Sequence, residues 1–180
     1  MKKVICLLII SLFLVSCGGS NMKTAVFETS AGSFEIELFV EEMPITTKNF
    51  IDLAEKGFYD GTKFHRVIQG FMIQGGDPLS KDEDKKHLWG SGDPGYKIKD
   101  EFGEGLSNVK GTIAMANSGP NTGGSQFFIN VVDNSRLDPK HPVFGEVVSG
   151  MEVVDQISRV STNQQGQPNE DVVIEKITIK

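Results

Sequence analysis

Two clusters of polar residues could form a phosphate-binding loop and a cation site, but the residue types at the required positions do not fit either. Residues 119–124 have the glycine spacing of a phosphate-binding loop, yet Ser125 stands where such a loop needs a lysine. Asp82, Asp84 and His87 could together bind a cation, but the charges around them are mixed, and the glycine and distal glutamate of a calcium loop are missing. We therefore interpret the second cluster as part of a solvated loop and expect no metal site.

Three longer blocks of sequence carry more specific information. They are FHRVIQGFMIQGGD (64–77), MANSGPNTGGSQFFI (115–129) and LDPKHPVFG (137–145). In residue type, order and spacing they resemble the cyclophilin family of peptidyl-prolyl cis-trans isomerases. The resemblance runs from about Lys23 to Lys180, and three long matches in sequence make chance agreement negligible.

The reaction that this resemblance implies is rotation about X–Pro peptide bonds. Resonance gives the amide C–N bond double-bond character, and the barrier to rotation is ~18–20 kcal/mol. Rotation breaks the resonance and leaves a lone pair on the proline nitrogen. The site therefore needs a dry pocket for the proline ring and a donor aimed at that nitrogen. Because no bond to carbon is made or broken, no nucleophile, metal ion or cofactor is expected.

The site residues are those that match the functional positions of the family. Arg66 matches the catalytic arginine, whose guanidinium is always charged and holds several donors in a fixed fork. The apolar wall of the proline pocket matches Phe71, Met72, Phe128 and Leu137, with His141 at its edge. The residues that hold the substrate backbone match Gln74, Ala116, Asn117, Ser118 and Gln126. His65 is interpreted as a structural neighbour of Arg66 rather than an acid or base.

One position departs from the family pattern. Many members have a tryptophan at the rim of the pocket, which helps to hold the cyclic peptide cyclosporin, and the corresponding residue here is Arg136. The single tryptophan of this chain is Trp89, in a long loop. This difference concerns the response to the inhibitor more than it concerns the isomerase activity.

The elements that must position these residues are mostly short strands. Alternating polarity predicts a β-hairpin in which Phe34, Ile36 and Leu38 face the core. We expect strands over 25–29, 33–38, 63–67, 71–74, 112–116, 126–132, 142–148 and 172–179, helices over 44–57 and 151–157, and a long polar loop over 78–95. The first helix should be capped by Thr46 or Thr47 and end at Gly57.

Many short strands with two helices favour a mainly β barrel or sandwich over a doubly wound fold. Periodicity does not choose between barrel and sandwich. The resemblance implies a closed antiparallel β-barrel of about eight strands, capped by two α-helices.

The N-terminus has the pattern of a targeting segment. Lys2 and Lys3 precede an apolar run over 4–15, which has the length of a signal-peptide core and falls short of the ~17–25 residues that span a bilayer. The alternative is a buried element of the domain. The run ends in Leu-Val-Ser-Cys, which resembles the processing box of bacterial lipoproteins, so we expect cleavage before Cys17 and acylation of that residue.

This pattern predicts how the chain is divided and where it is located. We expect a signal peptide over 1–16, a lipid-anchored tether over 17–22 and an isomerase domain over 23–180. The only other cysteine, Cys6, lies in the signal, so no disulfide is available to the domain. The expected location is the cell envelope, outside the cytoplasm.

The charge balance limits the possible partners. The formal net charge is -6 and there is no long run of Lys or Arg, which argues against nucleic acid as a partner. We expect proline-containing polypeptides as substrates, a membrane contact only through the lipid, and a monomer.

Two other functions remain as alternatives. One is a proline-peptide-binding chaperone module without essential turnover, but such a module has no need of the donor on Arg66. The other is a serine hydrolase that uses Ser125, His141 and an aspartate, but Ser125 does not lie in a Gly-x-Ser-x-Gly turn.

Overall fold

The computed structural model describes residues 22–180, and residues 1–21 lie outside the described part. The expected signal peptide, Cys17 and nearly all of the tether are therefore outside the described residues. Within residues 22–180, no helix has the length and apolar character needed to cross a membrane.

Eight strands form one antiparallel sheet, as expected for the mainly β class. They are β1 (Lys23–Thr29), β2 (Gly32–Leu38), β3 (Arg66–Ile68), β4 (Met72–Gly75), β5 (Thr112–Met115), β6 (Phe127–Asn130), β7 (Val143–Ser149) and β8 (Ile174–Ile179). Their order in the sheet is β3-β4-β6-β5-β7-β2-β1-β8. The predicted hairpin is confirmed as β1 and β2, which pair Phe27 with Phe34.

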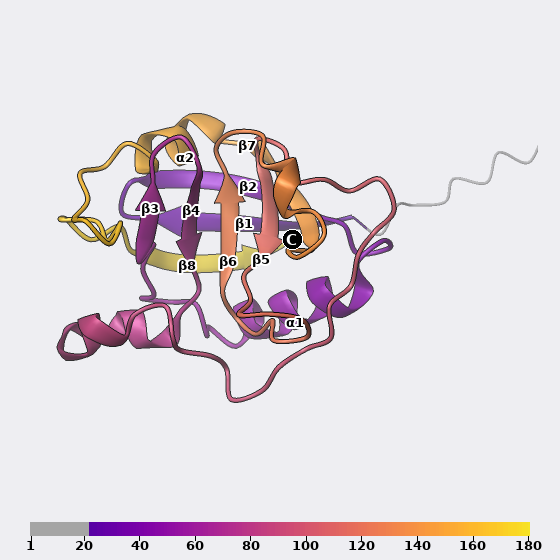
Figure 1. Ribbon diagram of the computed structural model, residues 1–180, viewed down its shortest axis with the longest axis horizontal. Helices are drawn as coiled ribbons and strands as arrows, with labels where there is room; N and C mark the ends of the chain where they lie inside the picture. The colour runs from indigo at the N-terminus through magenta and orange to yellow at the C-terminus, as the bar shows by residue number, and fades with distance from the viewer. Residues whose placement is uncertain (1–21) are drawn as a thin grey trace, which may run out of the picture.

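The sheet curls strongly but does not close. In Figure 1, β3, β4, β6 and β5 cross in front of β2, β1 and β8. The expectation of a closed barrel is wrong, because β3 and β8 stand at opposite ends of the sheet order. The short strand β3 donates its Val67 N–H to the Gly166 carbonyl of a loop at 2.7 Å. Just before β3 and β8, the chain forms an isolated bridge between Lys63 and Val173, flanked by backbone hydrogen bonds from Phe64 N–H to the Val172 carbonyl at 2.9 Å and from Ile174 N–H to the Thr62 carbonyl at 2.7 Å.

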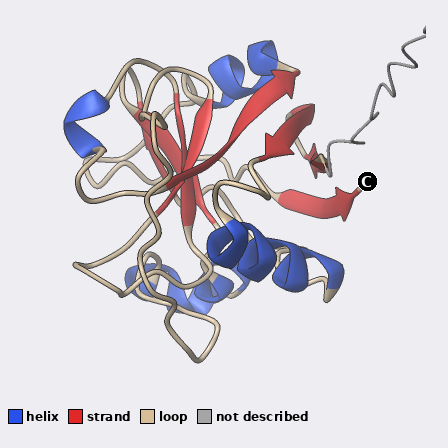
Figure 2. Cartoon of the chain, turned by 90° about the vertical axis from the view of Figure 1, so that its right-hand side faces the viewer, coloured by secondary structure: helices blue, strands red, loops and turns tan. Residues whose placement is uncertain are grey.

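Two α-helices lie at opposite sides of the curled sheet, as expected. They are α1 (Pro44–Glu55) and α2 (Met151–Ile157), and Figure 2 shows helices above and below the strands. Three short 3-10 helices accompany them: η1 (Pro78–Lys81), η2 (Glu83–Leu88) and η3 (Ser135–Leu137). The segment expected to be a loop over 78–95 thus contains two of them, at the lower left of Figure 1.

The start of α1 differs from the expectation. Pro44 occupies the first turn, and the free N–H groups of Ile45 and Thr46 donate to the carboxylate of Glu101 at 3.0 and 2.9 Å. The Thr47 hydroxyl donates back to the Met43 carbonyl instead of capping the helix. A carboxylate from a distant loop therefore satisfies the helix N-terminus. The end at Gly57 is confirmed, since this residue adopts a φ of 66°.

The main core is an aromatic cluster inside the curl of the sheet. Phe127 on β6 lies at its centre, with ring centroids 5.7 Å from Phe27, 5.8 Å from Phe50 and 5.7 Å from Tyr59. All three contacts are edge-to-face, the arrangement that aromatic quadrupoles favour. This core supports β6 from the inside, while the next residue, Phe128, faces the opposite side.

Candidate active site

The site lies on the outer face of β3, β4, β6 and β5. Arg66 pairs with Gln74, Gln74 pairs with Phe128, and Phe128 pairs with Ala114 across neighbouring strands. Directly opposed residues in a sheet share a face, so these side chains form one outward row. The alternating residues, such as Val67 and Ile73, point into the main core. Because successive side chains of a strand point to opposite faces, each of these strands contributes alternate residues to the core and to the site.

The row opens into a small cavity of about 150 Å³. Its lining consists of Arg66, Phe71, Met72, Gln74, Ala116, Asn117, Phe128, Leu137 and His141. The structure thus brings together Arg66 and all the residues predicted to bind the substrate except Ser118 and Gln126. Those two line a neighbouring cavity of about 290 Å³, which shares Gln74, Ala116 and Asn117 with the first.

The floor of the small cavity is a second apolar cluster, separate from the main core. Met72, Phe128, Ala114 and Val143 are buried in it, and the side chains of Phe71 and Leu137 pack against it half-buried. The predicted pocket residues are therefore neither ordinary core nor free surface. An apolar floor of this kind can bury a proline ring and exclude water from its amide.

His141 lies at the edge of this floor. Its ring meets Phe128 edge-on with centroids 5.4 Å apart, and its Nδ1 lies 3.2 Å from the Met115 carbonyl. A carbonyl only accepts, so Nδ1 is the donor in this contact. These two contacts fix the ring as part of the pocket wall.

Arg66 is the cation at the mouth of the small cavity. Its Nη1 donates to Gln74 Oε1 at 3.3 Å. Among the described residues, no carboxylate forms an ion pair with it. The other guanidinium donors of Arg66 are therefore available to a ligand in the cavity.

The segment 116–118 offers less backbone than expected. The Ala116 N–H donates to the Gln126 carbonyl at 3.0 Å, and the Ser118 N–H donates to Thr122 Oγ1 at 2.9 Å. The Asn117 side chain donates to the Lys140 carbonyl at 2.6 Å. With the N–H groups of Ala116 and Ser118 engaged, the Asn117 N–H is the backbone donor of this segment that can pair with an extended peptide.

Burial lowers the pKa of His65 below its ordinary value, and the nearby Asp77 opposes this effect only partly. The ring is 2% exposed, and neither nitrogen has a hydrogen-bond partner among the described residues. A neutral, enclosed imidazole next to Arg66 agrees with the structural role expected for it.

Two other features considered from the sequence are the cation cluster around Asp82 and the serine of the hydrolase alternative, Ser125. Asp82 caps η2 by accepting from the Asp84 N–H at 3.0 Å, and it pairs with Lys85 at 3.0 Å, which lowers its pKa. Within residues 22–180, no three acidic, His or Cys side chains are placed to hold a metal ion. Ser125 is buried and donates its hydroxyl to the Gly76 carbonyl at 2.7 Å, which is not the arrangement of a nucleophile.

Sequence reasoning missed most of the lining of the larger cavity. These residues are Gly90, Ser91, Gly92, Asp93, Lys97, Thr122, Gly124 and Ser125. The Gly-Ser-Gly run at 90–92 was the available signal, since glycines mark places where backbone approaches closely. Nothing in the local sequence indicated which part of the sheet that run approaches.

An apolar pocket with a charged donor at its mouth, on a curled antiparallel sheet, fits the requirements for rotation about X–Pro bonds without covalent chemistry. The family model "Cyclophilin type peptidyl-prolyl cis-trans isomerase/CLD" matches residues 24–179. The chain therefore belongs to the cyclophilin-type peptidyl-prolyl cis-trans isomerases and is an isomerase.

Related proteins and structures agree with this assignment. The chain is 45% identical over 150 residues to peptidyl-prolyl cis-trans isomerase-like 1 of Aspergillus fumigatus, covering 83% of this chain and 90% of that protein. It is 41% identical over 158 residues to peptidyl-prolyl cis-trans isomerase-like 3 of Homo sapiens, covering 87% and 95%.

A solved cyclophilin-type isomerase from Cryptosporidium parvum superimposes with a TM-score of 0.81 at 31% identity, covering 88% of this chain and 98% of that chain. The same isomerase has been solved in the presence of the dipeptide Ala-Pro, with a TM-score of 0.80. The predicted family, mainly β fold and enzymatic class are thus confirmed.

Proposed function

We propose that the protein catalyses X–Pro rotation with Arg66 as the donor to the proline nitrogen, and that it does so for exported polypeptides in the cell envelope. The observation that carries the catalytic part is the position of Arg66. It lies at the mouth of an apolar cavity and its guanidinium is held by Gln74. A charged donor in a partly dry site stabilises the lone pair that appears only in the twisted amide.

In this proposal the other site residues bind and orient the substrate. Phe71, Met72, Phe128 and Leu137 enclose the proline ring, with His141 as the edge of the wall. Asn117 pairs with the peptide main chain, while Gln74 and Gln126 border the path toward the larger cavity. No step uses a metal ion or a cofactor.

The test is an isomerisation assay on a short proline peptide, with the domain purified. We expect the wild-type protein to raise the rate of cis-trans exchange well above the spontaneous rate, with or without a chelator. A protein that binds the peptide without raising the exchange rate would instead be the chaperone module considered above.

The location is proposed from the sequence of residues 1–17 alone. Two lysines, an apolar run and the Leu-Val-Ser-Cys box support export, cleavage and acylation of Cys17. One acyl chain binds a membrane only marginally, at ~0.8 kcal/mol per buried CH₂, whereas several chains on one cysteine anchor stably. We further propose that the anchored domain is a monomer, since the site is built from one chain.

The prediction that tests the location is Cys17→Ser in the full-length protein. We expect wild-type protein in the membrane fraction with a lipid mass on Cys17, and we expect the variant to leave that fraction. Cys6→Ser is the matched control, because it changes the other cysteine inside the apolar run and should leave anchoring intact. Mass spectrometry that finds a mature N-terminus at Met1, or an unmodified Cys17, would contradict the proposal. The purified domain should keep its isomerase activity in every case.

A separate prediction concerns cyclosporin. Arg136 lies over the ring of Phe71, with Cζ 5.1 Å from the centroid, and so occupies the rim where many relatives place a tryptophan. Because a guanidinium lacks the broad apolar face of an indole, we expect weak inhibitor binding. Arg136→Trp should tighten binding measured by calorimetry, while Arg159→Trp on an exposed surface should not. Equal affinities of the wild-type and Arg136→Trp proteins would refute this explanation.

A further inference from the structure

A buried carboxylate holds the segment 78–92 against the edge of the active site. Asp77 follows β4 and is 0% exposed. Its Oδ1 accepts from the Leu79 N–H at 2.7 Å, and its Oδ2 accepts from the N–H groups of Gly90 and Gly92, the latter at 3.2 Å. The catalytic scheme above does not use Asp77. One carboxylate thus fixes the backbone at both ends of this segment.

The Gly90–Gly92 turn in turn fixes the orientation of an amide in the larger cavity. The carbonyls of Gly90 and Gly92 both accept from Gln126 Nε2, at 3.1 and 2.8 Å. Two acceptors on one side require the NH₂ end of the Gln126 amide to face the turn. Its Oε1 must therefore face the opposite way, toward Gln74.

The same argument carries to the catalytic arginine. Gln74 Nε2 donates to Gln126 Oε1 at 3.0 Å, so that Gln74 Oε1 faces Arg66 and accepts from its Nη1 at 3.3 Å. Each amide has one donor end and one acceptor end. The carbonyls of Gly90 and Gly92 therefore set the direction of the whole series of hydrogen bonds that runs through Gln126 and Gln74 to Arg66. If the amides turned over, Gln74 would present its NH₂ group to a guanidinium that only donates.

We propose that Asp77 is a positioning residue for isomerisation, acting through the orientation of the Gln126 and Gln74 amides on the guanidinium of Arg66. The inference rests on the proposed role of Arg66. In this proposal the segment 78–92 has a function. The carbonyls of Gly90 and Gly92 orient the Gln126 amide, which in turn makes Gln74 present its Oε1 to Arg66. Without Asp77 these carbonyls lose their fixed position, and Arg66 loses the contact that holds its fork in place.

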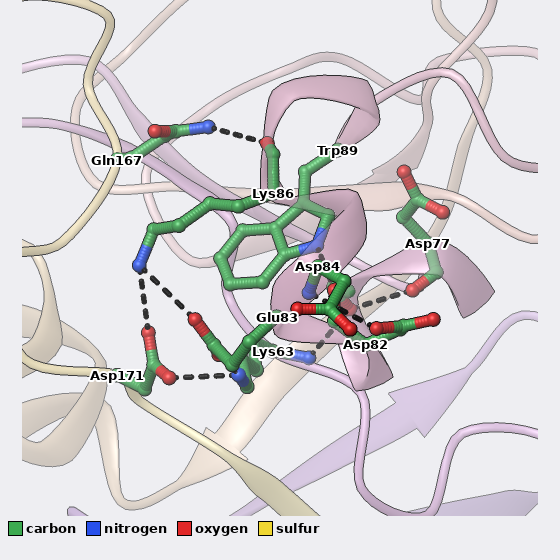
Figure 3. Close-up of polar contacts among 10 residues, drawn as sticks. Lys63, Asp77, Asp82, Glu83, Asp84, Lys86, Trp89, Gln167 and Asp171 are labelled. Atoms are coloured by element: carbon green, nitrogen blue, oxygen red, sulfur yellow. Dashed lines mark hydrogen bonds and ion pairs between the residues drawn. The ribbon is translucent and has the colours of Figure 1, made fainter.

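The outer side of the segment is anchored independently of Asp77. Trp89 lies under the ammonium groups of Lys63 and Lys86, at 4.7 and 4.8 Å from the ring centroid. Asp171 pairs with both lysines, at 2.7 and 3.7 Å (Figure 3). A variant at Asp77 can therefore disturb the inner turn while the segment stays docked. Trp89, the only tryptophan of the chain, reports that docking by its fluorescence.

The experiment compares Asp77→Asn with a matched control in the same segment. The substitution keeps the oxygen that accepts from Leu79 but places an NH₂ group before the N–H groups of Gly90 and Gly92. We expect kcat to fall by roughly tenfold to a hundredfold, the loss of one hydrogen bond to a charged group, with KM changed less than twofold because the proline pocket is untouched. Asp82→Asn, at the cap of η2, should leave kcat, KM and Trp89 emission at wild-type values.

A second background separates amide orientation from a general structural effect. In Gln74→Glu both carboxylate oxygens accept, so an acceptor faces Arg66 whichever orientation the Gln126 amide takes. In that background, adding Asp77→Asn should change kcat by less than twofold. Three results would overturn the proposal: the same decrease in kcat in both backgrounds, a change in KM with no change in kcat, or full activity of Asp77→Asn.

A further variant keeps the test valid if Asp77→Asn does not fold. A Cβ on Gly92 would come within 2.1 Å of Asp77 Oδ1, so Gly92→Ala displaces the carboxylate without removing it. It should give the same loss of kcat and the same insensitivity in the Gln74→Glu background. Arg66→Ala is measured in parallel: if that variant keeps full activity, the proposed function fails, whereas full activity of Asp77→Asn alone sinks only the present inference.

Discussion

The Arg66→Ala protein is expected to isomerise proline peptides with kcat/KM lowered by roughly tenfold to a thousandfold, because a transition-state donor of about 1.5–4 kcal/mol is lost. The loss should appear mainly in kcat, since the apolar floor that binds the proline ring remains. Exchange rates measured by NMR across a range of peptide concentrations would separate kcat from KM.

Two control variants make this result specific. Arg159→Ala removes an exposed arginine and should leave the rate unchanged. Arg66→Lys keeps the charge but not the planar fork, so it should recover only part of the rate. The domain should stay folded in each case, because Arg66 is half-buried on the outer face and outside the main core. A folded Arg66→Ala protein with full activity would refute the proposed mechanism.

The second large effect is expected on stability. Phe127→Ala should lower the free energy of unfolding by about 3–5 kcal/mol, the usual loss when a buried aromatic side chain is truncated. Phe127 is 0% exposed and lies between rings from β1, α1 and the Tyr59 turn. Removal leaves a cavity that these separate elements cannot fill together.

Urea unfolding followed by circular dichroism measures this effect. Val148→Ala is the control, because this β7 side chain is 50% exposed and its loss should change stability by less than about 0.5 kcal/mol. A decrease of under about 1 kcal/mol for Phe127→Ala would show that the aromatic cluster is not the centre of the core.

Local patterns predicted the parts of the fold that depend on local physics. The alternation of Phe34, Ile36 and Leu38 located β2 and its buried face, because strand periodicity is a property of neighbouring residues. The cap of α1 could not be found in this way, since Glu101 reaches it from another loop. The expectation of a closed sheet came from the resemblance and is wrong, because the edge of β3 bonds to Gly166 of a loop rather than to a strand.

The resemblance predicted which residues line the small cavity, but not the rest of the larger cavity or the hydrogen bonds that connect the two. The resemblance identified Arg66, the pocket residues and both glutamines, and the structure gathers them around two adjoining cavities. The relation of Asp77 to Gln126 depends on the backbone of the segment 78–92 returning to the sheet. The short 3-10 helices of this segment leave no recognisable periodicity in the sequence, so its path could not be predicted. The orientation of each glutamine amide depends on its hydrogen-bond partners in space, which the sequence does not show.

The pairing of β1 with β8 governs how this domain can fold. Ala25 lies opposite Ile179, so the two strands are separated by almost the whole described chain. Contacts of such high sequence separation require a large loss of chain entropy before they stabilise anything, and domains rich in them fold slowly. Until β8 has been synthesised, β1 keeps one row of N–H and C=O groups unpaired, an edge on which other strands can add. During synthesis this isomerase is therefore itself an incomplete sheet, open at that edge to chaperones and to misassembly.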